Sequence, residues 1–304
     1  MSNRRELISI DILPTYQCNY RCPYCFLGNL RNDNTVLNLD LCMQRLEEIN
    51  KIYNISTINL YGGEISLLHI NYINNLINIA SYYVTPNIVT NLSDWNFLSY
   101  LEKKDVTIST SLNDDRENND LLERRLCDHD CSNISILQVV TPSLLVEDRN
   151  RLSNRLYLSN ASFSFLRYSP STKADIKYSL NNRDYAMFIK ELITHFPGRI
   201  ENENELKQCL SGAYNPRMSS NIFINPQGKL MSVQYNSEHL EYFREYTSLK
   251  DWSIDCDIEY KLYRNHCREC RYFNHCYAEH LSFNHSIDDD CCGMYQLLNW
   301  YENK

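Results

Sequence analysis

The alternation of strand-like and helix-like segments over residues 7–195 is the feature that most constrains the fold of this chain. Six short segments are rich in Ile, Val, Leu, Phe or Thr and have strand character; they are 7–13, 57–61, 87–90, 106–112, 134–140 and 162–168. Segments with apolar residues at helical spacing follow them, at 37–53, 69–83, 93–103, 116–127, 144–158 and 183–195. This alternation indicates parallel βα units in an α/β fold. Because a full eight-unit barrel takes about 250 residues, two folds stay open, an incomplete barrel and a doubly wound sheet.

The alternation stops near Pro197-Gly198, where a polar and acidic stretch begins. Further on, Asn225-Pro226-Gln227-Gly228 separates two apolar runs, which predicts a β-hairpin. The remaining tail is rich in Cys and His. We therefore expect two domains, 1–196 and 197–304.

Composition excludes several classes of protein. The 304 residues carry 38 Asp+Glu against 30 Lys+Arg, a net charge of −8, which argues against a nucleic-acid partner. No apolar run approaches the roughly 20 residues of a membrane helix, and residues 7–13 are too short and polar for a signal peptide. We expect a cytoplasmic protein without a membrane partner. In that reducing compartment, the 13 Cys point to metal ligation or catalysis rather than disulfides.

The strongest motif is Cys18-x3-Cys22-x2-Cys25, which directly follows the first predicted strand. Three thiolates this close can hold one face of an iron–sulfur cluster. A structural zinc site would need a fourth ligand, and the next candidate, Cys42, falls on the apolar stripe of a predicted helix. With Tyr24 before its last cysteine, the motif resembles the radical S-adenosylmethionine (SAM) superfamily. That resemblance implies a partial (β/α)6 TIM-like barrel and a SAM-binding [4Fe-4S] cluster on these cysteines.

Further motifs agree with the resemblance, in strand order. Gly62-Gly63-Glu64 follows the second strand and is similar to the family's Gly-Gly-Glu element, although Ile65-Ser66 replaces the usual Pro-Thr. Two glycines allow a backbone to approach a ligand closely, and a carboxylate pairs with an ammonium group. Ser111-Leu112-Asn113 is similar to the family's Ser-Leu-Asp, and Thr90-Asn91 is a weaker match. The resemblance implies SAM-binding residues Tyr24, Gly62, Gly63, Glu64, Asn91 and Ser111, and reductive cleavage of SAM to a 5′-deoxyadenosyl radical.

The C-terminal cysteines form a second group, Cys267-x2-Cys270-x5-Cys276, followed by Cys291-Cys292. A zinc knuckle is one interpretation, with His275, His280 and His285 available. The spacing also resembles the SPASM (twitch-type) extension of radical SAM enzymes. By that resemblance we expect one auxiliary [4Fe-4S] cluster, whose ligands are Cys267, Cys270, Cys276 and either Cys291 or Cys292.

The second auxiliary site of that extension is broken in this chain. Val233 and His280 stand where the family has cysteines, so a reduced extension with one auxiliary cluster is expected. Two clusters that use Cys209, Cys256 or His280 as irregular ligands remain the alternative. Cys127-x3-Cys131 and Cys42 are interpreted as surface or packing residues.

Among SPASM relatives, maturation of a ribosomally made peptide (a RiPP) by cross-linking, epimerisation or backbone rearrangement is the first expectation. Small-molecule alcohol dehydrogenation is the alternative. Sulfatase maturation is disfavoured, because Gln234 stands where that family has its catalytic Asp. A molybdopterin-type cyclase is disfavoured because the Gly-Gly tail expected of that class is not found in this sequence. A zinc-binding adaptor is disfavoured because it would have no use for the intact Gly62-Gly63-Glu64.

The expected partners are the peptide and an electron donor such as flavodoxin or ferredoxin. The first strand starts near Leu7, which leaves no room before it for a fused leader-recognition domain, so a separate leader-recognition protein is expected. The motifs identify no acid or base at the substrate carbon.

Overall fold

The computed structural model describes residues 5–113, 116–147, 149–158, 160–168, 178, 180–212, 221–233, 243–255, 269–272, 276 and 294–304. The chain divides into two compact units. The first contains residues 1–110, 219–234 and 243–257; the second contains 111–218, 235–242 and 258–304. Each unit is described by itself.

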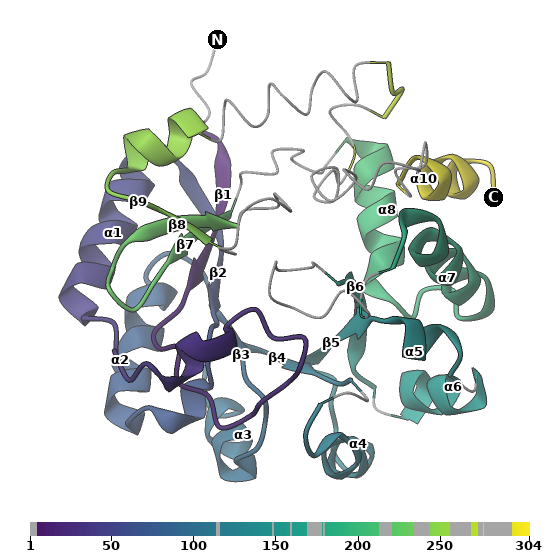
Figure 1. Cartoon of the computed structure of the whole chain (residues 1–304), viewed down its shortest axis with the longest axis horizontal. Coiled ribbons are helices and arrows are strands. Elements are labelled where there is room, and N and C mark those ends of the chain that lie inside the picture. Colours follow the sequence, from purple (N-terminus) through teal and green to yellow (C-terminus); the bar gives the residue numbers. More distant parts are fainter. Residues whose placement is uncertain are drawn as a thin grey trace. The chain divides into compact units, whose positions relative to one another are not determined.

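The first unit is built on a mainly parallel sheet with the strand order β4-β3-β2-β1-β7-β8-β9 (Figure 1). The strands are β1 (Leu7–Ile12), β2 (Asn54–Leu60), β3 (Asn87–Val89), β4 (Thr107–Ser111), β7 (Asn221–Ile224), β8 (Leu230–Val233) and β9 (Phe243–Tyr246). Pairing is parallel from β4 to β7, whereas β8 and β9 are antiparallel. Strands β1 to β4 neighbour one another in chain order, as in a barrel, whereas a doubly wound sheet reverses direction at a switch point.

Helices α1 (Leu39–Ile52), α2 (Ile70–Ser81) and α3 (Trp95–Leu101) follow β1, β2 and β3 in this unit. The side chain of Asn38 caps α1 by accepting the Leu41 N–H, and Asp94 caps α3 in the same way. Cys42, Leu46 and Ile49 form the buried stripe of α1. In the strands, fully buried Ile10 and Ile58 are paired, and so are Ile88 and Ile108. These residues form the core between sheet and helices. Two short 3-10 helices, Gly28–Asn32 and Ile65–Leu67, lie in the loops after β1 and β2.

The second unit contains two strands and six helices among its described residues. In chain order they are α4 (Asn119–Cys127), β5 (Ile134–Val140), α5 (Pro142–Leu145), α6 (Arg149–Leu158), β6 (Ser162–Arg167), α7 (Asn182–His195), α8 (Glu201–Ser211) and α10 (Met294–Glu302). Strands β5 and β6 are parallel. Helix α10 packs against α7 and α8, with Leu298 fully buried (Figure 1).

The predicted α/β fold is confirmed, and every strand expected over residues 7–168 is present. The hairpin is also confirmed, because β7 and β8 pair antiparallel around a turn in which Gly228 has φ +74°. The helix expected at 144–158 is instead two helices, α5 and α6. Helix α8 forms in the acidic stretch for which no helix was predicted. The domain boundary expected near residue 197 stays a prediction.

Among the described residues, no helix combines the length and apolar character needed to cross a membrane.

Candidate cluster and cofactor site

The three motif cysteines lie in the loop after β1, and all three thiols are half-buried. The Cys25 N–H donates to the Cys22 carbonyl at 3.2 Å, and the Tyr20 N–H donates to Cys18 Sγ at 3.4 Å, so the loop curls around its own sulfur atoms. Burial raises the pKa of the Cys25 thiol to about 11, and negative charge on Cys22 and Cys18 raises it further. The three cysteines thus lie on one short loop whose hydrogen bonds tie Cys18 to Tyr20 and Cys22 to Cys25.

The donor set fits an iron–sulfur cluster. In the described part of the chain, no three His, Cys, Asp or Glu side chains are grouped as ligands of a metal ion. Cluster thiolates bind different iron atoms and need not converge on one point. Three half-buried thiols on one loop therefore suit one face of a cluster. Tyr24, the aromatic residue before the last cysteine of the motif, lies half-buried in the same loop.

Gly62 and Gly63 lie directly against the residues that lead into this loop. The Gly63 N–H donates to the Thr15 carbonyl at 2.9 Å, and the Glu64 N–H donates to the Gln17 carbonyl at 2.8 Å. A β-carbon on Gly62, where φ is +126°, would lie 2.9 Å from the Thr15 oxygen, and one on Gly63 would overlap the Gln17 backbone. The two glycines thus pack against the backbone that leads into the cysteine loop, and the close approach to a ligand expected of them stays a prediction.

The Glu64 carboxylate is buried, with 1% of the residue exposed. It accepts hydrogen bonds from Thr90 Oγ1 at 2.6 Å, from the Asn91 N–H at 2.6 Å and from the Ser66 N–H at 3.0 Å. The loops after β2 and β3 are therefore joined through this one side chain. The three donors hold the Glu64 carboxylate in one orientation.

Ser111 ends β4, is half-buried and belongs to the second unit. Asn113, the third residue of the same motif, is buried. Its Oδ1 accepts a hydrogen bond from the Val139 N–H of β5 at 2.9 Å. Asn113 thus has a structural role where the family motif has Asp.

The C-terminal ligand set is described only in part. Cys270 and Cys276 are half-buried. Cys267, Cys291 and Cys292 lie outside the described residues, as do Cys256, His280 and Gln234. Cys209 is fully buried on α8, and Val233 is the last residue of β8.

The remaining cysteines agree with the packing interpretation. Cys42 and Cys131 are fully buried, and Cys127 is exposed at the end of α4.

One residue of chemical interest escaped the sequence analysis. Asp11 on β1 is only 7% exposed, and burial raises the pKa of its carboxyl to about 6. Its Oδ1 accepts from Asn59 Nδ2 at 2.7 Å; Asn59 Oδ1 accepts from Asn87 Nδ2 at 3.0 Å; and Ser109 donates to Asn87 Oδ1 at 3.0 Å. These side chains form a polar row across β1 to β4. The sequence contains a sign of this buried carboxyl, because Asp11 interrupts the apolar end of the first strand, Ile10-Asp11-Ile12-Leu13.

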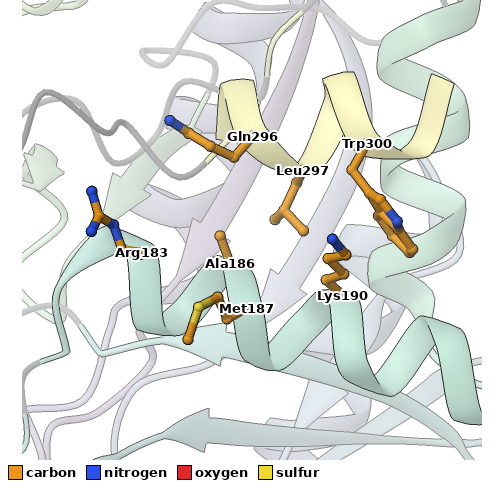
Figure 2. Close-up of a pocket in the computed structure, with 7 residues that line it drawn as sticks. All are labelled: Arg183, Ala186, Met187, Lys190, Gln296, Leu297 and Trp300. Carbon is orange, nitrogen blue, oxygen red and sulfur yellow. The ribbon is translucent and has the colours of Figure 1, made fainter. Parts of the chain in front are cut away.

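A cavity of about 210 Å³ lies in the second unit between α7 and α10. Figure 2 shows its lining, which is Arg183, Ala186, Met187, Lys190, Gln296, Leu297 and Trp300. The Lys190 Nζ lies 5.4 Å from the centre of the Trp300 ring, a cation–π contact. None of the site residues predicted from the sequence lines this cavity.

Comparison with known proteins gives three informative similarities, although no protein-family model matches the sequence. The "Cysteine-type anaerobic sulfatase-maturating enzyme" of Clostridium novyi (strain NT) is 25% identical over 209 residues, covering 58% of this chain. The match spans about half of that relative, 55% of its length.

Two solved structures share the fold over most of the chain. The structure of anSMEcpe with bound AdoMet and Cp18Cys peptide has a TM-score of 0.66 at 16% identity, covering 98% of this chain and 100% of that one. Streptococcus suis SuiB bound to S-adenosylmethionine has a TM-score of 0.60 at 17% identity, covering 90% and 73%. Both structures hold bound S-adenosylmethionine. The chain thus shares its fold with two proteins that bind S-adenosylmethionine, which agrees with the resemblance indicated by the cysteine motif.

Proposed function

We propose that this chain is a radical SAM enzyme that modifies a peptide. The main support for this proposal is that the Gly62-Gly63-Glu64 loop packs against the segment that leads into the cysteine loop. Glycine occupies both positions at which a side chain would collide with that segment. This contact supports the proposal, because it brings the Glu64 carboxylate next to the segment that carries the three cysteines. A structural zinc loop has no need of that combination.

The residues of this chain would act together as follows. Cys18, Cys22 and Cys25 would hold the cluster, and Glu64 would pair with the ammonium group of SAM. The hydrogen bonds to Thr90 and Asn91 keep the Glu64 carboxylate in place before the ligand arrives. A cluster held there would supply the electron for cleavage of SAM to methionine and a 5′-deoxyadenosyl radical. Roles for Gly62, Gly63, Tyr24 and Ser111 in binding SAM are part of the proposal.

A peptide substrate is supported by the fold relatives. The anSMEcpe structure contains the Cp18Cys peptide, and SuiB has been solved bound to the precursor peptide SuiA, with a TM-score of 0.55 to this chain. We propose hydrogen abstraction from such a peptide, with an auxiliary [4Fe-4S] cluster on Cys267, Cys270, Cys276 and one of Cys291 and Cys292. A separate leader-recognition protein and a flavodoxin- or ferredoxin-type electron donor complete the proposal.

Iron and sulfide analysis after anaerobic reconstitution tests this assignment. The wild type should hold about 8 iron per chain, falling to about 4 when Cys18, Cys22 and Cys25 are replaced by Ala. Cys270→Ala with Cys276→Ala should also leave about 4 iron, while the formation of 5′-deoxyadenosine from SAM stays detectable. Wild-type protein that binds zinc in place of iron and does not cleave SAM would refute the proposal.

Maturation of a sulfatase is the second candidate, favoured by the similarity to the Clostridium novyi enzyme. The two candidates differ in substrate. Incubation of the reconstituted protein with a cysteine-containing sulfatase peptide, followed by mass spectrometry, separates them. A mass change at the cysteine would favour sulfatase maturation; an unmodified peptide in the presence of 5′-deoxyadenosine formation would favour a different peptide.

A further inference from the structure

The loop after β3 contains a strained residue. Leu92 has φ +52°, a left-handed conformation that is unfavourable for a bulky side chain, and it is buried. Its neighbours hold it in place: the Leu92 N–H donates to Thr90 Oγ1 at 3.3 Å, and the Ser93 N–H donates to Asn91 Oδ1 at 2.8 Å. A strained conformation that the surroundings fix in this way is characteristic of a functional loop.

Asn19, between the first two motif cysteines, reaches this strained loop. Its Oδ1 accepts from Asn91 Nδ2 at 2.7 Å, and its Nδ2 donates to Ser93 Oγ at 2.8 Å. Both ends of the Asn19 amide are therefore used, and both partners flank Leu92. The cysteine loop is thus bonded to the loop after β3 on either side of its strained residue.

Asn91 also contacts Glu64, because its backbone N–H donates to Glu64 Oε2 at 2.6 Å. A continuous series of hydrogen bonds therefore runs from the residue after Cys18, through Asn91, to the carboxylate of the Gly-Gly-Glu element. We infer that Asn19 is a positioning residue that couples the geometry of the cysteine loop to the occupancy of the Glu64 site. This inference rests on the proposed function, in which the cluster and the ammonium group of SAM occupy those two places.

Coupling between two sites is reciprocal. An ammonium group at Glu64 changes the charge that Asn91 faces, and the change is passed to the cysteine loop through Asn19. Conversely, a cysteine loop no longer held by Asn19 leaves Asn91 free to shift, which weakens the Glu64 site. Coupling of this kind typically changes the affinity of a ligand by about 5- to 150-fold.

The test compares reconstituted wild type with Asn19→Leu, which keeps the size of the side chain and removes both hydrogen bonds. Asn19→Asp keeps the acceptor for Asn91 and loses the donor to Ser93. Asn32→Leu is the matched control, because Asn32 is also an exposed asparagine near the loop, but it contacts Arg21 at 3.4 Å and not the loop after β3. The probe is SAM itself, and the readouts are iron content, SAM dissociation constant and the SAM-induced change in the electron paramagnetic resonance spectrum of the reduced protein.

We expect Asn19→Leu to retain wild-type iron, to bind SAM about tenfold more weakly and to show a smaller spectral change. Asn19→Asp should lie between it and wild type, and Asn32→Leu should match wild type. A dissociation constant for Asn19→Leu within twofold of wild type would overturn the inference alone. Loss of iron in Asn19→Leu would also overturn it, since Asn19 would then retain the cluster instead of coupling two sites. A wild type that does not bind SAM refutes the proposed function itself.

A double-mutant cycle gives an independent answer. If Asn19 acts through its bond to Asn91, Asn19→Leu combined with Asn91→Ala should weaken SAM binding no more than the more severe single variant. If the two losses of SAM affinity multiply in the double variant, Asn19 and Asn91 act separately, and the proposed coupling through their hydrogen bond is wrong.

Discussion

Gly63 lies so close to the backbone of Gln17 that any side chain at position 63 would collide with the Gln17 carbonyl. The contact is fixed by the adjacent hydrogen bond from the Glu64 N–H to the Gln17 oxygen, 2.8 Å long. Gln17 directly precedes Cys18. The shape of the Gly-Gly-Glu loop and the path of the chain into the first cluster ligand therefore depend on each other.

Gly63→Ala should destabilise the fold and impair the site together. Overpacking of a backbone contact costs about 1–3 kcal/mol of unfolding free energy, and the displaced cysteine loop should hold less iron after reconstitution. Gly198→Ala is the control, since nothing lies within 4 Å of a β-carbon there and only the φ of +72° is unfavourable. Urea unfolding and iron analysis of both variants check the prediction; equal iron content in both would contradict it.

Asp11 should make stability depend on pH. Near pH 4 and below, its carboxyl is neutral in the folded protein; as the pH rises from about 4 to about 6, the unfolded chain ionises while the folded protein keeps the proton, so stability falls. Above about pH 6 the carboxyl is ionised in both states, and the loss of unfolding free energy stays constant at about 3 kcal/mol for a raised pKa of this size. Asp11→Asn should therefore stabilise the protein at pH 8 and have little effect near pH 4.

Ser9→Ala, on the same strand, serves as the control for Asp11→Asn because it removes no titratable group. Its effect on the unfolding free energy should be equal at the two pH values. If Asp11→Asn changes stability equally at both, the carboxyl does not carry the predicted proton in the folded state.

Arg155 should be essential to the second unit. Its side chain is 1% exposed and is paired with Glu123 at 2.9 Å and with Glu147, 6% exposed, at 3.0 Å. Arg155→Met leaves these carboxylates without the buried partner and should cost about 3–5 kcal/mol of unfolding free energy.

Arg151 offers a matched comparison for Arg155. It contacts the same two glutamates at 3.4 and 3.5 Å, but its side chain is 45% exposed. Arg151→Met should therefore cost at most about 1 kcal/mol. Denaturant midpoints of the two variants, measured side by side, test this difference. Similar losses of unfolding free energy would show that burial does not determine how much each arginine stabilises the second unit.

Tyr301 should fasten α10 to α8. Its hydroxyl donates to Glu203 Oε1 at 2.7 Å, and burial together with Glu203 raises the pKa of Tyr301 to about 12. Tyr301→Phe removes one charged hydrogen bond and should cost about 1.5–3 kcal/mol. Amide exchange over residues 294–302 should accelerate in this variant. Unchanged exchange there would mean that the apolar contacts of α10 suffice.

The strands and the motif loops could be predicted because their signals are local. The apolar run of β1, the glycine turn at Gly228 and the spacing of the cysteines each depend on residues close together in sequence. Helix α8 was missed for the opposite reason. Asn202 is buried there because its amide bonds to both backbone groups of Phe165, at 2.8 and 3.0 Å. The buried face of α8 combines Asn202 and Glu203 with Leu206 and Cys209, so its apolar spacing is too short to predict a helix.

The site shows the same limit. Sequence spacing was enough to single out Cys18, Glu64 and Asn91, but not the bonds among Asn19, Asn91 and Ser93, which join residues 72 and 74 positions apart. Nor did it indicate that the glycine pair meets backbone. Such contacts depend on how two loops are placed by separate strands, and no single stretch of sequence encodes that placement.

The pairing of β1 with β7 has a consequence for how the protein is made. β1 is not an edge of the sheet: its second side is closed by Asn221–Ile224, and the Leu13 N–H, just before the cysteine loop, donates to the Ile224 carbonyl at 2.8 Å. During synthesis the first strand leaves the ribosome more than two hundred residues ahead of this partner. Until then it offers an open row of backbone donors and acceptors. The open side of β1 and the segment that leads into the cysteine loop therefore gain this support only after residues 221–224 have been made.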